Sequence, residues 1–253
     1  MADHSELPPA VLVTGASGAI GAATVSAFLA AGLHVVGADR EAPIPSAAHA
    51  RLTSLCVDVS DGAALEAALG EVCTTCQLAH LVGVAGGALP EEPAAALDAG
   101  GLSPDRFRAS IDVNLTTQYV ALHTALPWLR RGSGANRSVT FTSSINGLAG
   151  WGMPAYSAAK AGLVGMMRAL VGPLGAEGIR VNVVAPGTVR TPRTERIWGL
   201  VPGHFERLER GTALGRLGTP EDVARVFVAL ATSLTHVNGQ VMVVDGGQMQ
   251  KRG

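Results

Sequence analysis

The chain has 253 residues, of which 47% are apolar and only 15% charged, and its 19 basic and 20 acidic side chains leave a net charge of −1. This apolar fraction is ample for a buried core and excludes an intrinsically disordered chain. The near-neutral balance also leaves no electrostatic basis for nucleic-acid binding, which calls for clustered lysine and arginine. The length is typical of a single α/β domain.

The sequence gives no sign of export or membrane insertion. Residues 1–10 have neither the basic nor the apolar segment of a signal peptide, and they predict a flexible tail before one domain over 11–253. No apolar run reaches the ~18 residues that a membrane span requires. Three cysteines cannot all pair, so no disulfide framework is indicated. We therefore expect a soluble, cytoplasmic protein that binds neither membrane nor nucleic acid.

Short apolar runs alternate with helical stretches along the chain. We expect strands at residues 11–13, 34–38, 55–57, 78–84, 139–142, 181–184 and 240–244. Between them we expect helices at 19–31, 62–72, 104–131, 154–176 and 220–232. Because the strands are apolar throughout, they predict a parallel sheet covered by helices on both faces, a doubly wound, Rossmann-type α/β fold. In such a sheet, ligands bind beyond the carboxyl ends of the strands.

Two stretches interrupt the alternation. Residues 88–103 are rich in Ala, Gly and Pro and predict a loop at the ligand-binding edge. Residues 192–215 predict a mobile lid over the site. Several arginines cluster around this lid, and nearby glutamates balance their charge, which is typical of a solvated face, although an acidic substrate also fits. The arginines are Arg190, Arg193, Arg196, Arg207 and Arg210.

A glycine-rich turn joins the first predicted strand to the first helix. Gly15, Gly18 and Gly21 allow the backbone to approach a pyrophosphate, which then binds the free N–H groups at the start of the helix. Asp39 ends the second strand 18 residues after Gly21, where a carboxylate can bind both ribose hydroxyls of an adenosine and repel a 2′-phosphate. The pattern predicts NAD. Arg40 can attract a phosphate, so NADP stays an alternative.

Tyr156 and Lys160 lie four residues apart at the start of a predicted helix and therefore share one face. A free tyrosine has a pKa of about 10, and a neighbouring ammonium lowers it toward neutral pH. The chain has only two tyrosines and two lysines, so this pairing stands out. Ser143 or Ser144, after the strand at 139–142, can donate a hydrogen bond to a substrate carbonyl. The set predicts proton transfer at a substrate oxygen.

Cys73, Cys76 and His80 raise the alternative of a metal site. A single Cys-x-x-Cys without a second pair does not complete a structural zinc set. The residues instead predict the end of a helix before a strand, so we expect no metal.

Together these motifs resemble the short-chain dehydrogenases/reductases, in their shorter branch, over nearly the whole chain. Tyr156 and Lys160 match the family's Tyr-x-x-x-Lys pair, Ser144 its carbonyl-binding serine, and Asn114 the asparagine that holds a proton-relay water to the lysine. Asn114, Tyr156 and Lys160 also count among the cofactor contacts that the resemblance implies. The others are Gly15, Ser17, Gly18, Ile20, Gly21, Asp39, Arg40, Asp58, Val59, Ala85, Gly86, Pro186, Gly187, Val189 and Thr191.

Three positions depart from the family pattern. Ala19 stands where the glycine turn usually has a third close glycine. Residues 83–86 are Gly-Val-Ala-Gly where Asn-Asn-Ala-Gly is usual, which leaves open how that strand end is braced. The interval from Ser144 to Tyr156 is one residue shorter than usual. Ser143 restores the interval, but Ser144 fits the Ser-x-x-Gly register, so we favour Ser144.

The resemblance implies an NAD-dependent oxidoreductase that interconverts a secondary alcohol and a ketone, with Tyr156 as general acid/base. Residues 215–224 and 239–247 are similar to bacterial 3-oxoacyl-acyl carrier protein reductases, so an NADPH-dependent 3-oxoacyl-thioester reductase is the alternative. A non-catalytic NAD-binding regulator is a third possibility. The resemblance also implies a homotetramer assembled through the helices at 104–131 and 154–176.

Overall fold

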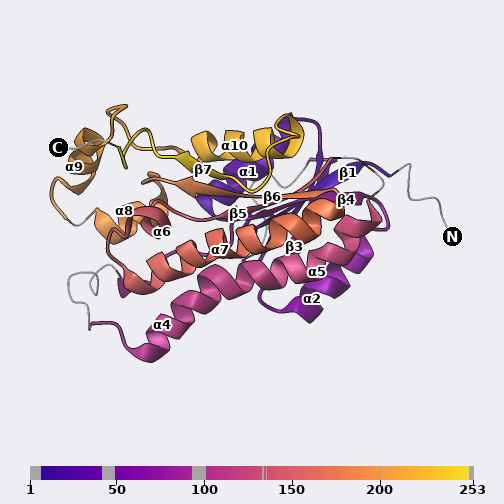
Figure 1. Ribbon diagram of the computed structural model, residues 1–253, viewed down its shortest axis with the longest axis horizontal. Coiled ribbons are helices and arrows are strands. Elements are labelled where there is room, and N and C mark those ends of the chain that lie inside the picture. The colour runs from indigo at the N-terminus through magenta and orange to yellow at the C-terminus, as the bar shows by residue number, and fades with distance from the viewer. Residues whose placement is uncertain are drawn as a thin grey trace.

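A seven-stranded sheet forms the centre of the computed structural model, which describes residues 7–41, 49–92, 101–132, 134, 136–199 and 201–250. The strand order is β3-β2-β1-β4-β5-β6-β7, and every neighbouring pair runs parallel. This confirms the predicted doubly wound α/β fold (Figure 1). The strands are β1 (Pro9–Thr14), β2 (His34–Asp39), β3 (Leu52–Cys56), β4 (Gln77–Gly83), β5 (Arg137–Thr142), β6 (Ile179–Pro186) and β7 (Val241–Val244).

Helices cover both faces of the sheet. On one face α1 packs against α10, and on the other α2, α5 and α7 lie together (Figure 1). The helices are α1 (Ala19–Ala30), α2 (Gly62–Val72), α4 (Pro104–Ile111), α5 (Thr117–Arg131), α6 (Asn146–Ala149), α7 (Pro154–Ala176), α8 (Pro192–Trp198), α9 (His204–Gly211) and α10 (Pro220–Thr232).

The apolar strands supply two separate cores because successive side chains point to opposite faces. In β1, Leu12 is buried in the core under α2, α5 and α7. Its neighbours Val11 and Val13 are buried in the core under α1 and α10, together with Phe28 and Phe227. A strand that is apolar at every position is therefore required at the centre of this sheet.

The structure corrects several boundaries. Strand β1 begins at Pro9, so the predicted tail over residues 1–10 loses its last two residues to the sheet, and residues 1–6 lie outside the described chain. The predicted helix at 104–131 is divided by a π-helical segment, η2 (Asp112–Thr116), between α4 and α5. The predicted lid contains two helices, α8 and α9. Of the predicted loop at 88–103, residues 93–100 lie outside the described chain.

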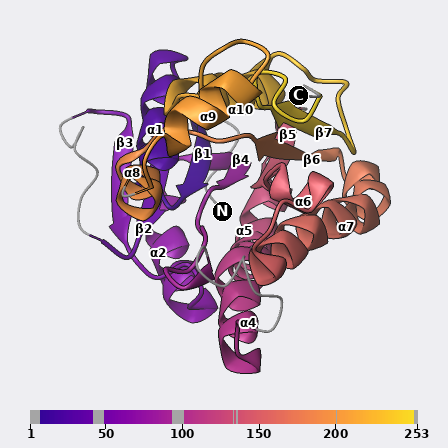
Figure 2. The ribbon, with the colours of Figure 1, turned by 90° about the vertical axis from the view of Figure 1, so that its left-hand side faces the viewer.

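All seven strands run to the same edge, where their carboxyl ends meet. Figure 2 looks onto this edge, and α6, α8 and α9 lie around it. Within the described ranges, no helix combines the length and apolar character that crossing a bilayer requires.

Candidate active site

The glycine turn between β1 and α1 is built by close backbone packing. Gly15 has φ +67°, and a side chain there would collide with the backbone of Ala85. A side chain on Gly21 would collide with the carbonyl of Gly15. Gly18 caps α1 without any side-chain acceptor for the first-turn N–H groups, and that turn holds no acidic residue. The unpartnered N–H groups and the positive end of the helix dipole suit the pyrophosphate of a dinucleotide.

The acid predicted to select the cofactor lies against this turn. One oxygen of Asp39, at the end of β2, accepts the N–H of Ser17 at 2.9 Å, and the other accepts the N–H of Glu41 at 3.2 Å. Asp58 lies just beyond β3, where the hydroxyl and N–H of Ser60 lower its pKa, with a smaller contribution from Arg40. Val59 beside it is buried. The structure therefore gathers the predicted adenosine contacts at the ends of neighbouring strands.

The end of β4 is braced by residues from neighbouring elements. The hydroxyl of Thr14 accepts the N–H groups of Val84 at 3.2 Å and Ala85 at 3.3 Å. From α5, the buried amide of Gln118 donates to the carbonyl of Ala85 at 3.4 Å. A side chain on Gly83 would collide with this amide. Thr14 and Gln118 thus provide the polar contacts left open by the missing Asn-Asn pair.

Asn114 lies in the π-helical segment η2, fully buried, and holds the next turn. Its side-chain oxygen accepts the N–H of Gly87 at 2.7 Å, and its side-chain nitrogen donates to the carbonyls of Gly87 and Ser110 at 3.1 and 3.0 Å. Both ends of the amide are therefore engaged in fixing the Gly86–Gly87 turn. The role of Asn114 in holding a relay water stays a prediction.

Lys160 and Tyr156 share one face of α7, as the spacing predicts. The buried ammonium of Lys160 lies 5.6 Å from the centre of the Tyr156 ring and donates to the carbonyl of Thr142 at 2.8 Å. Burial, and then the positive charge of Arg193, lower the pKa of Lys160 to about 7. Lys160 is therefore poised between its charged and neutral forms near neutral pH.

The pKa of Tyr156 moves in the direction opposite to the expected lowering, and the effect of Lys160 on it stays a prediction. Burial raises the pKa of Tyr156, and the groups that oppose burial are the Ser144 hydroxyl and then the Arg193 guanidinium. The physical reason is burial of the phenol, which disfavours the charged phenolate and outweighs these two groups.

The two candidate serines have different surroundings. The Ser143 hydroxyl donates to the main-chain carbonyl of Lys160 at 2.7 Å, which ties β5 to α7. The Ser144 hydroxyl lies beside the Tyr156 phenol and accepts the N–H of Asn146 at 3.2 Å. The structure therefore places Ser144, rather than Ser143, next to the tyrosine.

The segment after β6 returns to the same edge. The N–H of Gly187, just after Pro186, donates to the carbonyl of Val244 at 2.9 Å, and Val189 is buried beside Gly218. Thr191 caps α8, since its hydroxyl accepts the N–H of Thr194 at 3.1 Å. The hydroxyl of Thr191, which we predict to contact the cofactor, therefore also caps α8.

Comparison with known proteins agrees with this geometry. Residues 15–249 match the family model described as Enoyl-(Acyl carrier protein) reductase. The chain belongs to the short-chain dehydrogenase/reductase family. Enzymes of this family act on CH–OH groups with a nicotinamide cofactor, so the predicted oxidoreductase class is confirmed.

Relatives within the family span nearly the whole chain. An uncharacterized oxidoreductase, C922.06, of Schizosaccharomyces pombe is 36% identical over 94% of this chain and 89% of its own length. L-fucose dehydrogenase of Mus musculus is 32% identical over 94% of this chain and 87% of its own length. A crystal structure of a short-chain dehydrogenase/reductase family oxidoreductase from Burkholderia thailandensis has a TM-score of 0.86 at 35% identity, covering 97% of this chain and 94% of that one.

The sequence analysis missed Glu92 altogether and named Arg193 only as one of several lid arginines, without its contact with this short-chain dehydrogenase/reductase site. Arg193 on α8 donates to the carbonyls of Gly86 and Ala88, residues more than 100 positions away. Glu92, 1% exposed, accepts the N–H of Leu89 at 2.6 Å and the hydroxyl of Ser110 at 2.8 Å. No local pattern marks either residue, because each depends on contacts between loops and helices.

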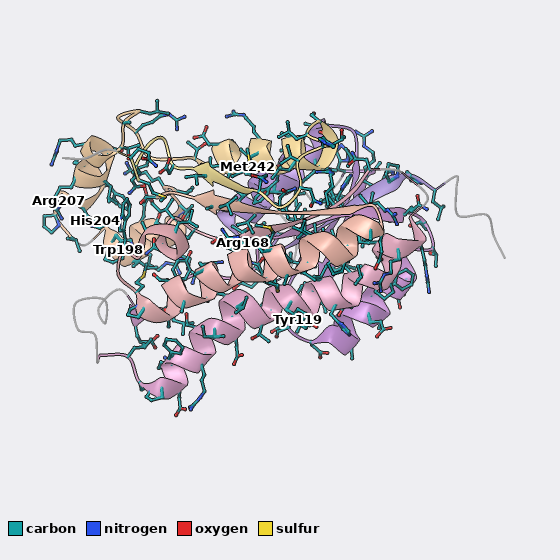
Figure 3. All side chains as sticks on the ribbon, in the orientation of Figure 1. Tyr119, Arg168, Trp198, His204, Arg207 and Met242 are labelled. Atoms are coloured by element: carbon teal, nitrogen blue, oxygen red, sulfur yellow. The ribbon has the colours of Figure 1, made fainter. Side chains whose placement is uncertain are left out.

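Other features of the lid are aromatic. Trp198 and His204 stack with ring centres 4.8 Å apart. Both residues are labelled at the left of Figure 3. The Arg190 guanidinium lies 5.2 Å from the centre of the Phe205 ring, and Arg190 also pairs with Glu195 at 3.0 Å. These contacts hold the two short helices of the lid together.

The residues considered for metal binding have other partners. His80 is buried in β4, its ring Nδ1 lies 2.9 Å from the hydroxyl of Ser138, and burial lowers its pKa to about 4. Cys73 and Cys76 are buried free thiols at the end of α2. Across the ranges that the structure describes, no three metal-ligating side chains gather in one place.

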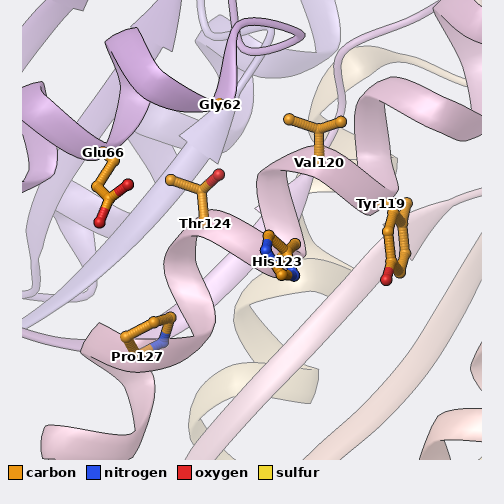
Figure 4. Close-up of a pocket in the computed structure, with 7 residues that line it drawn as sticks. All are labelled: Gly62, Glu66, Tyr119, Val120, His123, Thr124 and Pro127. Carbon is orange, nitrogen blue, oxygen red and sulfur yellow. The ribbon is translucent and has the colours of Figure 1, made fainter.

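A surface cavity of about 220 Å³ lies away from this site, between α2 and α5 (Figure 4). None of its lining residues belongs to the predicted catalytic or cofactor-binding set. They are Gly62, Glu66, Tyr119, Val120, His123, Thr124 and Pro127.

Proposed function

We propose that this protein is an NAD(H)-dependent oxidoreductase that interconverts a secondary alcohol and a ketone. The observation that carries the proposal is the meeting of Tyr156, Lys160 and Ser144 at the carboxyl edge of the sheet, which also holds the glycine turn. Asn114 supports the same edge through Gly87.

Asp39 supports NAD rather than NADP. Its carboxylate ends β2 beside the glycine turn, and a negative charge there attracts ribose hydroxyls and repels a 2′-phosphate. The N–H groups at the start of α1 would hold the pyrophosphate, and Lys160 the nicotinamide ribose. When bound, the cofactor exchanges hydride with the carbon that bears the hydroxyl.

The residues of the chain would handle the proton and the oxygen. Tyr156 accepts the hydroxyl proton in alcohol oxidation and returns it in ketone reduction. Ser144 hydrogen-bonds the same oxygen and stabilises the charge that develops on it. Lys160, with a pKa of about 7, can pass a proton onward at neutral pH. Asn114 anchors the relay water of the proposed mechanism and fixes the Gly86–Gly87 turn.

The alternative function is an NADPH-dependent 3-oxoacyl-thioester reductase. The description of the matching family model and the segments at 215–224 and 239–247 support it, whereas Asp39 opposes it. A non-catalytic NAD-binding regulator has no physical need for the complete set of Tyr156, Lys160, Ser144 and Asn114, so we place it last.

We also propose that the protein acts in the cytoplasm as a homotetramer, joined through α4, α5 and α7. Large apolar side chains are exposed along the first two helices and the segment between them, namely Phe107, Val113 and Tyr119. Light scattering should give the mass of four chains. A monomer at assay concentration would contradict the assembly.

The function is tested by cofactor titration followed by a turnover assay. NADH should bind more tightly than NADPH, measured by nicotinamide fluorescence, and Asp39→Ser should remove that preference because the repelling charge is gone. Wild-type protein with NAD should then oxidise members of a panel of secondary alcohols. Tighter binding of NADPH would indicate that Arg40 outweighs Asp39 in cofactor selection, and it would favour the thioester reductase. NADH binding without turnover of any alcohol or 3-oxoacyl thioester would favour the regulator.

A further inference from the structure

Arg193 has no carboxylate partner among the residues that the structure describes. Its guanidinium donates to two main-chain carbonyls, that of Gly86 at 3.3 Å and that of Ala88. Other arginines do have acidic partners: Arg190 pairs with Glu195, and Arg216 pairs with Asp222. Because a guanidinium binds a carboxylate more strongly than a neutral carbonyl, Arg193 retains capacity for an anionic ligand.

Arg193 lies at the catalytic edge rather than on the outer face of the lid. A side chain on Gly87 would overlap its guanidinium. The opposite side of the same turn is held by Asn114, and a side chain on Gly86 would approach Lys160 Nζ to 3.5 Å. The positive charge of Arg193 also lowers the pKa of both Lys160 and Tyr156. The two hydrogen bonds to Gly86 and Ala88 and the close approach to Gly87 therefore place this cation at the turn beside the reacting groups.

The acid whose charge acts on Tyr156 is already committed. Glu92 raises the pKa of Tyr156 through its charge, yet its two oxygens accept hydrogen bonds from Ser110 and Leu89. Glu92 is 1% exposed, whereas Arg193 is exposed on α8. An incoming ligand therefore meets the arginine rather than the glutamate.

We propose that Arg193 binds an anionic group of the substrate, so that the preferred substrate is a hydroxy acid and the product its oxo acid. This inference rests on the proposed function, because it uses the same hydroxyl chemistry at Tyr156. In the oxidation, the C–H bond of the hydroxyl carbon breaks and its hydride reduces NAD to NADH. The hydroxyl proton passes to Tyr156. The carboxylate stays bound to Arg193 and is chemically unchanged.

The test compares Arg193→Gln with Arg196→Gln in the complete protein. Arg196 lies three residues further along α8, is exposed, and makes no hydrogen bond or ion pair with the site residues that the structure describes, so its replacement removes the same charge without touching the turn. The first probe is a series of straight-chain carboxylates from acetate to octanoate, each with its primary amide. Their binding to the NADH complex is read from nicotinamide fluorescence.

The second probe is turnover of 2-, 3- and 4-hydroxy acids, each compared with its amide. A hydrogen-bonded charge pair predicts an acid-over-amide preference of about 10- to 100-fold in the wild type. Arg193→Gln should remove this preference by weakening the binding and turnover of the acids but not of the amides, and Arg196→Gln should keep it. NADH affinity should stay the same in all three proteins.

Three results would overturn the assignment of Arg193. The first is a wild-type preference for amides. The second is equal binding of acids by Arg193→Gln and wild type. In the third, Arg193→Gln weakens the binding of NADH and leaves the acid-to-amide ratio unchanged, which would indicate that Arg193 binds the pyrophosphate of the cofactor. If carboxylates bind through Arg193 but no alcohol is turned over, the anion site stands and the proposed function fails.

Discussion

The glycine turn after β1 and the catalytic edge around α7 are built by different kinds of contact. The turn depends on backbone packing between close neighbours, such as Gly15 and Gly21, which leave no room for a side chain. The catalytic edge depends on polar side chains that join distant segments, as Gln118 joins α5 to Thr142 and Arg193 joins α8 to Gly86. The turn should therefore tolerate no added atom, whereas the edge should respond to changes in charge and hydrogen bonding.

The largest effect is expected at the turn. In Gly21→Ala, the new methyl group meets the Gly15 carbonyl, so the turn must open, and NADH affinity should fall at least ~100-fold with a loss of stability. Gly70→Ala in α2 is the matched control. A side chain there meets nothing within 4 Å, so the free energy of unfolding should rise by about 0.5–1 kcal/mol. Unchanged NADH binding by Gly21→Ala would contradict the close-packing account.

At the catalytic edge, the buried amine of Lys160 should lower the free energy of unfolding. Lys160→Met should raise the free energy of unfolding at pH 7 by about 2–4 kcal/mol, because Lys160 holds a pKa of about 7 when folded against its ordinary 10.5. Thr142 keeps a donor in Gln118 after the substitution.

The sign of the pH dependence follows from this lowered pKa. Stability due to the neutral amine is present above pH 10.5 and is lost as the pH falls to 7. The advantage of Lys160→Met should therefore shrink between pH 7 and pH 9.5 in denaturant titrations without cofactor. An advantage that is equal at both pH values would show that the amine is not desolvated.

A smaller effect is expected for Gln118, which braces the ends of both β4 and β5. Gln118→Met keeps the length of the side chain but leaves the N–H of Thr142 without its acceptor, which should lower the free energy of unfolding by about 1–2 kcal/mol. Gln240→Met is the control because Gln240 is exposed, and its change should stay below about 0.5 kcal/mol. Equal changes in the two variants would contradict the bracing role of Gln118.

The sequence predicts the parts of this molecule that depend on local patterns. The fold follows from apolar strands and helical periodicity, and the contact of Asp39 with the turn follows from their positions at neighbouring strand ends. The raised pKa of Tyr156 and the position of Arg193 could not be predicted. The first depends on burial, and the second on a contact between residues 107 positions apart.

The most direct test of the proposed chemistry replaces each of the two tyrosines by phenylalanine. Tyr156→Phe removes only the phenolic oxygen, so NADH affinity should stay nearly the same while turnover of the best alcohol falls at least ~100-fold. Tyr119→Phe is the control because it removes the same phenolic oxygen from α5 and keeps the apolar ring that supports the proposed tetramer, so both quantities should stay unchanged. Turnover by Tyr156→Phe at the wild-type rate would contradict the role of Tyr156 as the proton-transfer group.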